Sequence, residues 1–254
     1  DTRHMAPSGS GKPMLHPVVG KLYIAQNVSS SVGKFYRCFS PPNSIQYFPL
    51  CDDFGPMNIA SVLRFIEAIS NEIDNFPTQK IIYIVNSGKR SLSNGAFLLG
   101  SYMLLKLKVS VSEISRCFSW LDSSIAEPFR DATFAPVDFE LSVLDCWRGL
   151  EKAMRWEWVA ASPSPVPSSS SPPSPANLRQ LDLSEYEHYD DPLNGDLHEV
   201  VPGKFVAFKG PKDVGGGREF FDDSRGYRYF SPIYYVDIFR ELGVTDVVRL
   251  NEPE

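Results

Sequence analysis

Cysteine is the side chain in this sequence best suited to attack a phosphate group, and the chain has four of them. A cysteine-dependent phosphatase needs a thiolate at the end of a strand, a loop whose amides surround the phosphate, and an arginine six residues later that binds two phosphate oxygens. The residues six positions after Cys38, Cys51, Cys117 and Cys146 are serine, methionine, serine and lysine. We therefore predict that this chain carries no catalytic residue.

The elements that would position such a loop are present between Lys80 and Leu107. The β-branched run at 81–85 predicts a buried strand, residues 86–88 a small polar loop, and the apolar run at 96–104 a buried helix. Backbone amides at the start of such a helix can bind an anion. A nucleotide-binding loop is excluded, because Arg90 occupies the place of the metal-binding hydroxyl residue. The segment thus has the shape of a phosphate site without its chemistry, and we predict no cofactor and no metal site.

Composition argues against several classes of protein. The chain has 254 residues, 43% of them hydrophobic, enough for one large or two small domains. A net charge of −6 argues against a nucleic-acid binder that relies on bulk positive charge. Scattered cysteines favour a reducing compartment, and no apolar run is long enough to cross a bilayer. We therefore expect a soluble cytoplasmic or nuclear protein with no nucleic-acid or membrane partner.

Hydrophobic periodicity predicts alternating strands and helices after residues 1–16, which we expect to be a disordered leader. The predicted elements are strands at 21–25 and 45–50, a helix at 52–73 with Asn58 as its cap, a helix at 111–120 with a capping box from Ser110 to Glu113, a loop at 127–131, and a helix at 139–158 with Leu141, Leu144, Leu150 and Met154 facing inward. This alternation is typical of a layered α/β domain.

A change of composition marks the end of this first region. Residues 162–175 are almost entirely serine and proline, a composition that cannot bury a core and predicts a linker or an inserted surface loop. The Ser-Pro pairs at Ser162, Ser164, Ser171 and Ser174 fit either an inert spacer or sites for proline-directed kinases. Both interpretations remain open.

An acidic stretch follows at residues 181–199. It contains no lysine or arginine, and its acidic residues are Asp182, Glu185, Glu187, Asp190, Asp191, Asp196 and Glu199. Charge of one sign usually marks a solvated face, but it also suits a surface that recognises a basic peptide.

The remaining residues begin a second domain. Patterning predicts one or two strands at 200–210, a glycine-rich loop at 211–226, a helix at 231–242 and a strand at 244–250. A parallel strand normally requires a crossover and further strands that cover it, so we expect this second domain to be incomplete.

Six short segments, in this order, resemble one family of phosphatases. They are DFGPMN at 53–58, PFRDA at 128–132, EYEHY at 185–189, NGD at 194–196, VPGKFVAF at 201–208 and VVRLN at 247–251. From about Leu15 to Asn251 the chain is similar to the cell-division-cycle-fourteen type of dual-specificity protein phosphatase, which acts in mitotic exit.

The resemblance implies an α/β fold of tandem dual-specificity-phosphatase-like domains, each with a central sheet flanked by helices. The implied boundaries are a leader at 1–16, a non-catalytic domain at 17–161, the Pro/Ser insertion at 162–180, an acidic linker helix at 181–196, and the start of a truncated catalytic domain at 197–254. The empty phosphate loop agrees with a non-catalytic first domain.

The implied function is dephosphorylation of proline-directed phosphoserine and phosphothreonine in cell-cycle control, with this chain as the substrate-recognition half. Expected partners are phosphoproteins with a basic residue near the phosphosite. The implied location is nucleus and cytoplasm, including the spindle pole or centrosome. The alternative is a catalytically inactive family member that serves as a binding module, or an incomplete gene product.

The resemblance also assigns candidate site residues. Glu187 and Asp190 take the role of the acids that bind the basic residue of the substrate, with weaker help from Glu185 and Asp182. Residues three apart share a helix face, so the first pair can address one lysine together. For Arg130 and Asp131 we expect a structural salt bridge and no role in a site.

Overall fold

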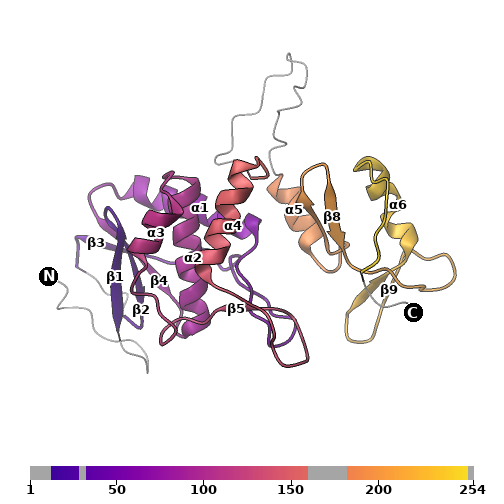
Figure 1. Cartoon of the computed structure of the whole chain (residues 1–254), viewed down its shortest axis with the longest axis horizontal. Helices are drawn as coiled ribbons and strands as arrows, with labels where there is room; N and C mark the ends of the chain where they lie inside the picture. The colour runs from indigo at the N-terminus through magenta and orange to yellow at the C-terminus, as the bar shows by residue number, and fades with distance from the viewer. Residues whose placement is uncertain (1–12, 29–32, 160–181, 251–254) are drawn as a thin grey trace, which may run out of the picture. The chain divides into compact units, whose positions relative to one another are not determined.

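The computed structural model describes residues 13–28, 33–159 and 182–250, and the chain divides into two compact units at residues 1–163 and 164–254 (Figure 1). Together the described parts form a mixed α/β structure with six helices. The whole Pro/Ser insertion at 162–180, with its Ser-Pro pairs, lies outside the described residues.

A four-stranded sheet organises the first unit. Its strands are β1 (Met14–Val19), β2 (Leu22–Gln26), β3 (Tyr36–Phe39) and β4 (Lys80–Val85), in the order β1-β2-β4-β3. β4 lies between β2 and β3 and is parallel to both, whereas β1 is antiparallel to β2. The buried strand predicted at 81–85 is therefore confirmed.

The two faces of this sheet have different neighbours. Ile81, Tyr83 and Val85 belong to the main hydrophobic core of the unit, whereas Ile82 and Ile84 belong to a small cluster on the other face. This alternation follows from the two-residue period of a strand. Figure 1 shows the four helices of the unit on one side of the sheet, so the large core lies between the sheet and these helices.

Capping residues set where the helices begin. The helices are α1 (Ile59–Asn75), α2 (Lys89–Leu105), α3 (Val111–Cys117) and α4 (Val143–Arg155). The Asn58 side chain accepts a hydrogen bond from the Ser61 amide at 2.8 Å, as the sequence predicted. The capping box from Ser110 to Glu113 is present, and Ser142 forms a second box with Asp145. Such caps stabilise a helix by about 0.5–2 kcal/mol each.

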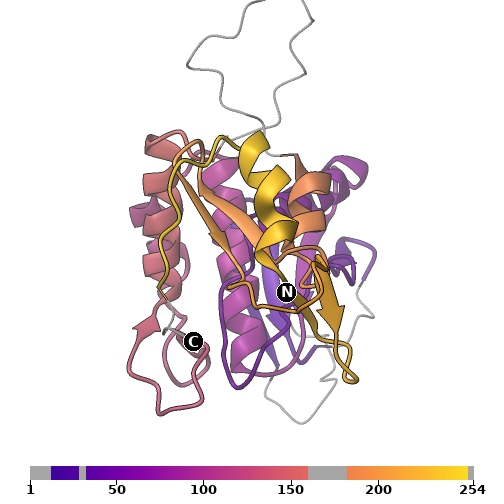
Figure 2. The ribbon, with the colours of Figure 1, turned by 90° about the vertical axis from the view of Figure 1, so that its right-hand side faces the viewer.

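Helix α2 is the central helix of this unit. Every residue from Leu92 to Leu105 is buried, because α2 packs against the sheet and also contacts α1, α3 and α4. In Figure 2 the magenta α2 stands beside the salmon α4. Gly100 of α2 faces the indole ring of Trp147 on α4, and a Cβ at this position would lie closer to the ring than 3.0 Å. The absence of a side chain at Gly100 therefore permits this helix contact.

The second unit has a small, mainly aromatic core. It contains α5 (Leu183–Asp190), a hairpin of β7 (Leu197–Val201) and β8 (Phe205–Phe208), a hairpin of β9 (Phe220–Asp222) and β10 (Arg228–Phe230), and α6 (Pro232–Glu241). Leu197, Phe230 and Tyr235 are its buried hydrophobic centre. The Tyr235 hydroxyl donates to the Gly195 carbonyl at 2.8 Å, which joins α6 to the turn before β7.

Several predicted strands and loops are corrected by the structure. β1 places residues 14–16 in the sheet, so the ordered chain begins before Lys21, while residues 1–12 are not described. Residues 45–50 form no strand, since β3 occupies the edge beside β4. The loops predicted at 127–131 and 211–226 each contain a short strand, β5 (Phe129–Arg130) and β9, because β6 (Glu140–Leu141) and β10 provide partners.

The helix boundaries and the last strand also differ from the predictions. α1 begins at Ile59 because Asn58 caps it, so residues 52–57 are not helical. α4 begins at Val143 after its cap, which leaves Leu141 exposed in β6 rather than facing inward. Leu144, Leu150 and Met154 pack against the core, as predicted. Residues 244–250 form no strand and have no sheet partner among the described residues, and Val247, Val248 and Leu250 are exposed.

Candidate functional site

The loop between β4 and α2 has the strand–loop–helix geometry expected of an anion site. Gly88 precedes the first turn of α2 with a φ of +107°, a conformation that L side chains rarely adopt. The Gln26 side-chain amide donates to the carbonyls of Asn86 at 2.6 Å and of Gly88 at 2.9 Å, which ties the loop to β2. The Gln26 side chain thus holds the loop between β4 and α2 in place.

Arg90, in the first turn of α2, forms ion pairs with two carboxylates. Its Nε contacts the Glu127 carboxylate at 2.9 Å, and one terminal nitrogen contacts Asp52 at 3.0 Å. Burial alone would lower the pKa of Arg90, but the hydrogen bonds to Glu127 and Asp52 outweigh it and raise that pKa. Arg90 therefore remains charged and is paired within the protein.

Arg130 shares this cluster. It pairs with Asp52, so the predicted structural salt bridge is correct for Arg130 but its partner is not Asp131. The Oδ1 atom of Asp131 is buried and makes no hydrogen bond to any described residue. The carboxylates of Asp52 and Glu127 balance the two arginines, so these cations stabilise the structure.

None of the four cysteines is placed like a phosphatase nucleophile. All four are free thiols, and none lies in the loop between β4 and α2. Burial raises the pKa of Cys38, and it raises the pKa of Cys146 to about 11 with help from the neighbouring Asp145. These two thiols are neutral at neutral pH, and a neutral thiol is a poor nucleophile.

Helix α5 brings the candidate recognition residues together in the second unit. Asp182 is the N-cap of α5, and its carboxylate accepts hydrogen bonds from the amides of Ser184 at 2.9 Å and Glu185 at 3.1 Å. Glu185 and Glu187 are exposed on the helix, and Asp190 is its last residue. The structure thus places all four predicted residues on one short helix and its cap.

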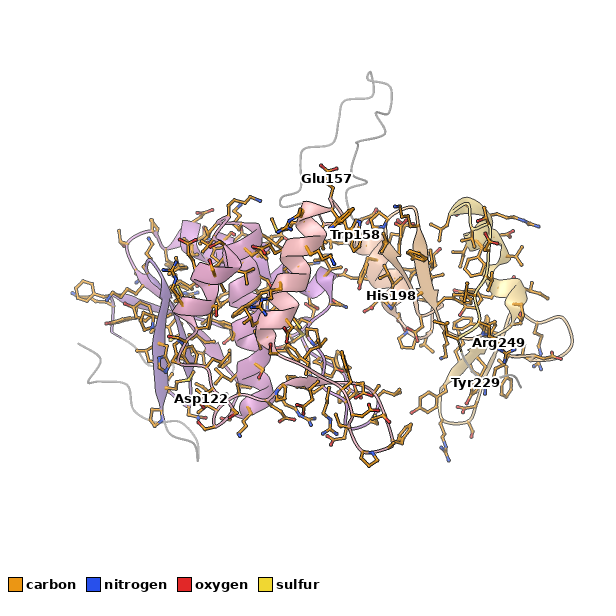
Figure 3. All side chains as sticks on the ribbon, in the orientation of Figure 1. Asp122, Glu157, Trp158, His198, Tyr229 and Arg249 are labelled. Atoms are coloured by element: carbon orange, nitrogen blue, oxygen red, sulfur yellow. The ribbon has the colours of Figure 1, made fainter. Side chains whose placement is uncertain are left out.

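His198 on β7 lies between two of the acids. Its Nδ1 is 3.6 Å from a carboxylate oxygen of Asp190, and its Nε2 is 3.7 Å from one of Asp196. The Tyr186 ring of α5 packs on the imidazole with ring centres 5.6 Å apart. Figure 3 labels His198 beside α5. When it is protonated, His198 attracts both carboxylates and thereby holds the C-terminal end of α5 against the β7–β8 hairpin.

The pH dependence of this contact follows from the direction of the pKa shift. The Asp196 carboxylate, followed by Asp190, raises the pKa of His198 above 6.5 against the opposing effect of burial. Stabilisation by protonated His198 is therefore complete below pH 6.5 and is lost as the pH rises through the raised pKa. We expect an NMR titration of His198 to have a midpoint above that of a histidine in an unstructured peptide. Asp196→Asn should lower the midpoint, and an unchanged midpoint in that variant would contradict the assigned cause.

Two further features of the described residues bear on function. Within residues 13–28, 33–159 and 182–250, no group of three or more His, Cys, Asp or Glu side chains is arranged to hold a metal ion. In the same ranges no helix combines the length and the apolar character that spanning a membrane requires.

Comparison with known proteins identifies the family. A family model described as the N-terminal half of dual specificity protein phosphatases matches residues 17–153, just over half of the chain. Human dual specificity protein phosphatase CDC14C is 32% identical over 216 residues, which cover 84% of this chain and 43% of the relative. The chain belongs to the CDC14-type dual specificity phosphatase family.

Other members of this family show a similar extent of likeness. Human CDC14A is 30% identical over 237 residues, covering 91% of this chain and 36% of the relative. The tyrosine-protein phosphatase cdc-14 of Caenorhabditis elegans is 28% identical over 216 residues, covering 82% of this chain and 27% of the relative. This CDC14-type chain thus spans less than half the length of these relatives.

Sequence reasoning about this CDC14-type chain missed His198. The prediction treated the stretch from 181 to 199 only as a series of acids, whereas the structure inserts an imidazole between two of them. One signal was available, since His198 lies between Asp196 and Glu199 in the sequence. The contact with Asp190 could not be read from the sequence, because it requires α5 to pack on β7.

Proposed function

We propose that this chain is the substrate-recognition half of a CDC14-type protein phosphatase. Its substrates would be phosphoproteins with phosphoserine or phosphothreonine before proline and a basic residue nearby, in cell-cycle control. The observation that carries this proposal is the acidic helix α5, in which Glu185 and Glu187 are exposed and Asp190 follows one turn later. Residues 181–199 contain no lysine or arginine.

The structure gives the four acids unequal parts in this proposal. Glu187 and Asp190 lie three residues apart, so one lysine can approach both. Asp182 already accepts two amide hydrogen bonds as a cap, so its contribution is indirect. The charge of Asp190 is partly balanced whenever His198 is protonated. Preference for a basic residue should therefore increase as His198 loses its proton.

The domain organisation supports the same assignment. We propose that residues 17–161 form a non-catalytic phosphatase-like domain, that 181–196 link it to a second such domain, and that 197–254 begin that domain. The paired arginines near α2 and the neutral thiols of Cys38 and Cys146 support a first domain without phosphatase chemistry. By family resemblance, we place the protein in nucleus and cytoplasm, with the spindle pole or centrosome included.

The second candidate is a catalytically inactive family member that serves as a binding module. It is favoured by the absence of a Cys-x5-Arg motif from the 254 residues. A Cys-x5-Arg motif in residues that follow Glu254 in the natural protein would decide for the enzyme.

Charge reversal on α5 tests the recognition surface. We expect this chain to bind a pSer-Pro-x-Lys peptide several-fold more tightly than pSer-Pro-x-Ala at low salt, since exposed ion pairs contribute about 0.2–1 kcal/mol each. The preference should shrink at physiological salt, where the Debye length is about 8 Å. In Glu187→Lys/Asp190→Lys the preference for lysine should disappear, as measured by fluorescence anisotropy of labelled peptides.

The matched control is Asp237→Lys/Glu241→Lys on α6. It makes the same change in net charge in the same unit, on exposed positions away from α5. It should keep the preference for lysine. If the α5 variant retains the preference at low salt, α5 is a solvated face and the recognition proposal is wrong.

A further inference from the structure

A second candidate binding site lies at the β9–β10 hairpin, and no residue of α5 lines it. A shallow cavity of about 340 Å³, open to solvent, is lined there by Lys212, Asp213, Val214, Arg218, Phe221 and Tyr229. Phe221 and Tyr229 are directly opposite each other in the two strands, so their side chains project from the same face of the hairpin. Figure 3 labels Tyr229 at this hairpin. The lining of the cavity therefore includes two aromatic rings and two cations.

The charge of this cavity contrasts with that of its surroundings. Acidic residues outnumber lysine and arginine in residues 182–250, yet the cavity has two cations and one acid. That acid, Asp213, accepts a hydrogen bond from the Gly215 amide at 2.8 Å and is thereby held by its own loop. The nearby Arg228 binds Asp222 through two nitrogens at 2.7 Å and is balanced. Two cations beside two aromatic rings suit an anionic ligand that also has an apolar part.

The two cations are held in position before any ligand arrives. Arg218 donates from Nε to the Gly215 carbonyl at 3.3 Å and from a terminal nitrogen to the Val214 carbonyl at 2.6 Å. These bonds use two of its five N–H donors. The Lys212 ammonium lies 5.2 Å from the centre of the Tyr229 ring, within the range of a cation–π contact. Binding thus requires little further ordering of either side chain.

We propose that this cavity binds a phosphorylated side chain of a peptide, with the phosphate between Lys212 and Arg218 and the carbon stem against Phe221 and Tyr229. A phosphate has several strong acceptor oxygens and close to two negative charges, so both cations can bind it together. The site lies outside the α5 surface. It shares with the proposed function only the class of ligand, a phosphopeptide.

Direct binding to the whole chain tests this site without any measurement of activity. The probe is a labelled peptide with one phosphoserine and no lysine or arginine, compared with the unphosphorylated peptide, with a glutamate version and with inorganic phosphate. We expect the phosphopeptide to bind most tightly and to shift the NMR signals of the Gly215, Gly216 and Gly217 amides. Lys212→Gln/Arg218→Gln should weaken binding about three- to tenfold, as expected for the loss of two partly exposed charge contacts.

Arg225→Gln is the matched control, because Arg225 is an exposed cation on the turn of the same hairpin and does not line the cavity. It should bind the phosphopeptide like the original chain. Lys212→Gln alone keeps the Arg218 hydrogen bonds of the loop, and it should still weaken binding. Equal losses in Arg225→Gln, or no loss in either variant at Lys212, would overturn the proposal. The probe has no basic residue, so its binding does not depend on the acids of α5. A negative result in the α5 experiment would therefore leave the proposal for this cavity standing.

Discussion

No hydrolysis of p-nitrophenyl phosphate above the buffer rate is expected from this 254-residue chain. Covalent phosphatase chemistry needs a thiolate nucleophile with its arginine, and no cysteine here is followed by arginine six residues later. Removal of a nucleophile from a covalent mechanism costs several orders of magnitude in rate. The elevated pKa values of Cys38 and Cys146 act in the same direction.

The assay needs one positive control and four variants. Human CDC14A under identical conditions would show that the assay detects a phosphatase of this family. Any turnover by the present chain should be tested in Cys→Ser variants at positions 38, 51, 117 and 146. Activity that disappears in one of these variants would show that this chain contains a nucleophile that neither its sequence nor its geometry indicates.

Gly100→Ala is expected to destabilise the first unit by about 2–4 kcal/mol, or roughly 5–15 °C in Tm. The new Cβ would overlap the ring of Trp147, which is only 2% exposed. The ring cannot move freely, because its Nε1 donates to the Phe97 carbonyl at 3.1 Å. Loss of this buried hydrogen bond costs about 1–3 kcal/mol, which exceeds the gain of about 1 kcal/mol in helix propensity. Thermal unfolding followed by circular dichroism measures the change.

Gly149→Ala is the matched control in the partner helix α4. Gly149 is exposed, and a Cβ there would meet no atom within 4 Å. The same substitution should therefore stabilise the unit by up to about 1 kcal/mol through helix propensity alone. A Gly100→Ala protein as stable as the original would show that α2 and α4 can separate at little cost.

The helices were predicted well because their signals are local. Asn58 and the box from Ser110 to Glu113 mark helix starts through hydrogen bonds within one turn, so neighbouring residues contain the information. The apolar run of α2 likewise predicted a helix buried on all sides. Two helices were predicted to begin too early, and the errors affect residues 52–57 and Leu141. In both cases the capping residue sets the helix start, although the hydrophobic spacing continues before it.

The strands were predicted less well because a strand needs a partner. Residues 45–50 and 244–250 have apolar side chains suited to strands, yet neither pairs with another described segment. In contrast, β5 and β9 lie in stretches that read as loops and become strands because β6 and β10 lie beside them. Pairing is a property of the folded chain, so local propensity is a weak guide to it.

By itself the sequence determined the order of the main helices, the buried strand and helix from Lys80 onward, the missing nucleophile and the acidic stretch of α5. These features depend on residue identity and on spacing within one or two turns. Tertiary structure decided the close approach of Gly100 to Trp147, the imidazole of His198 between Asp190 and Asp196, and the cavity at Lys212 and Arg218. Each of these joins residues from different elements, and the distance between such residues is set by packing and hydrogen bonds that form only when the chain folds.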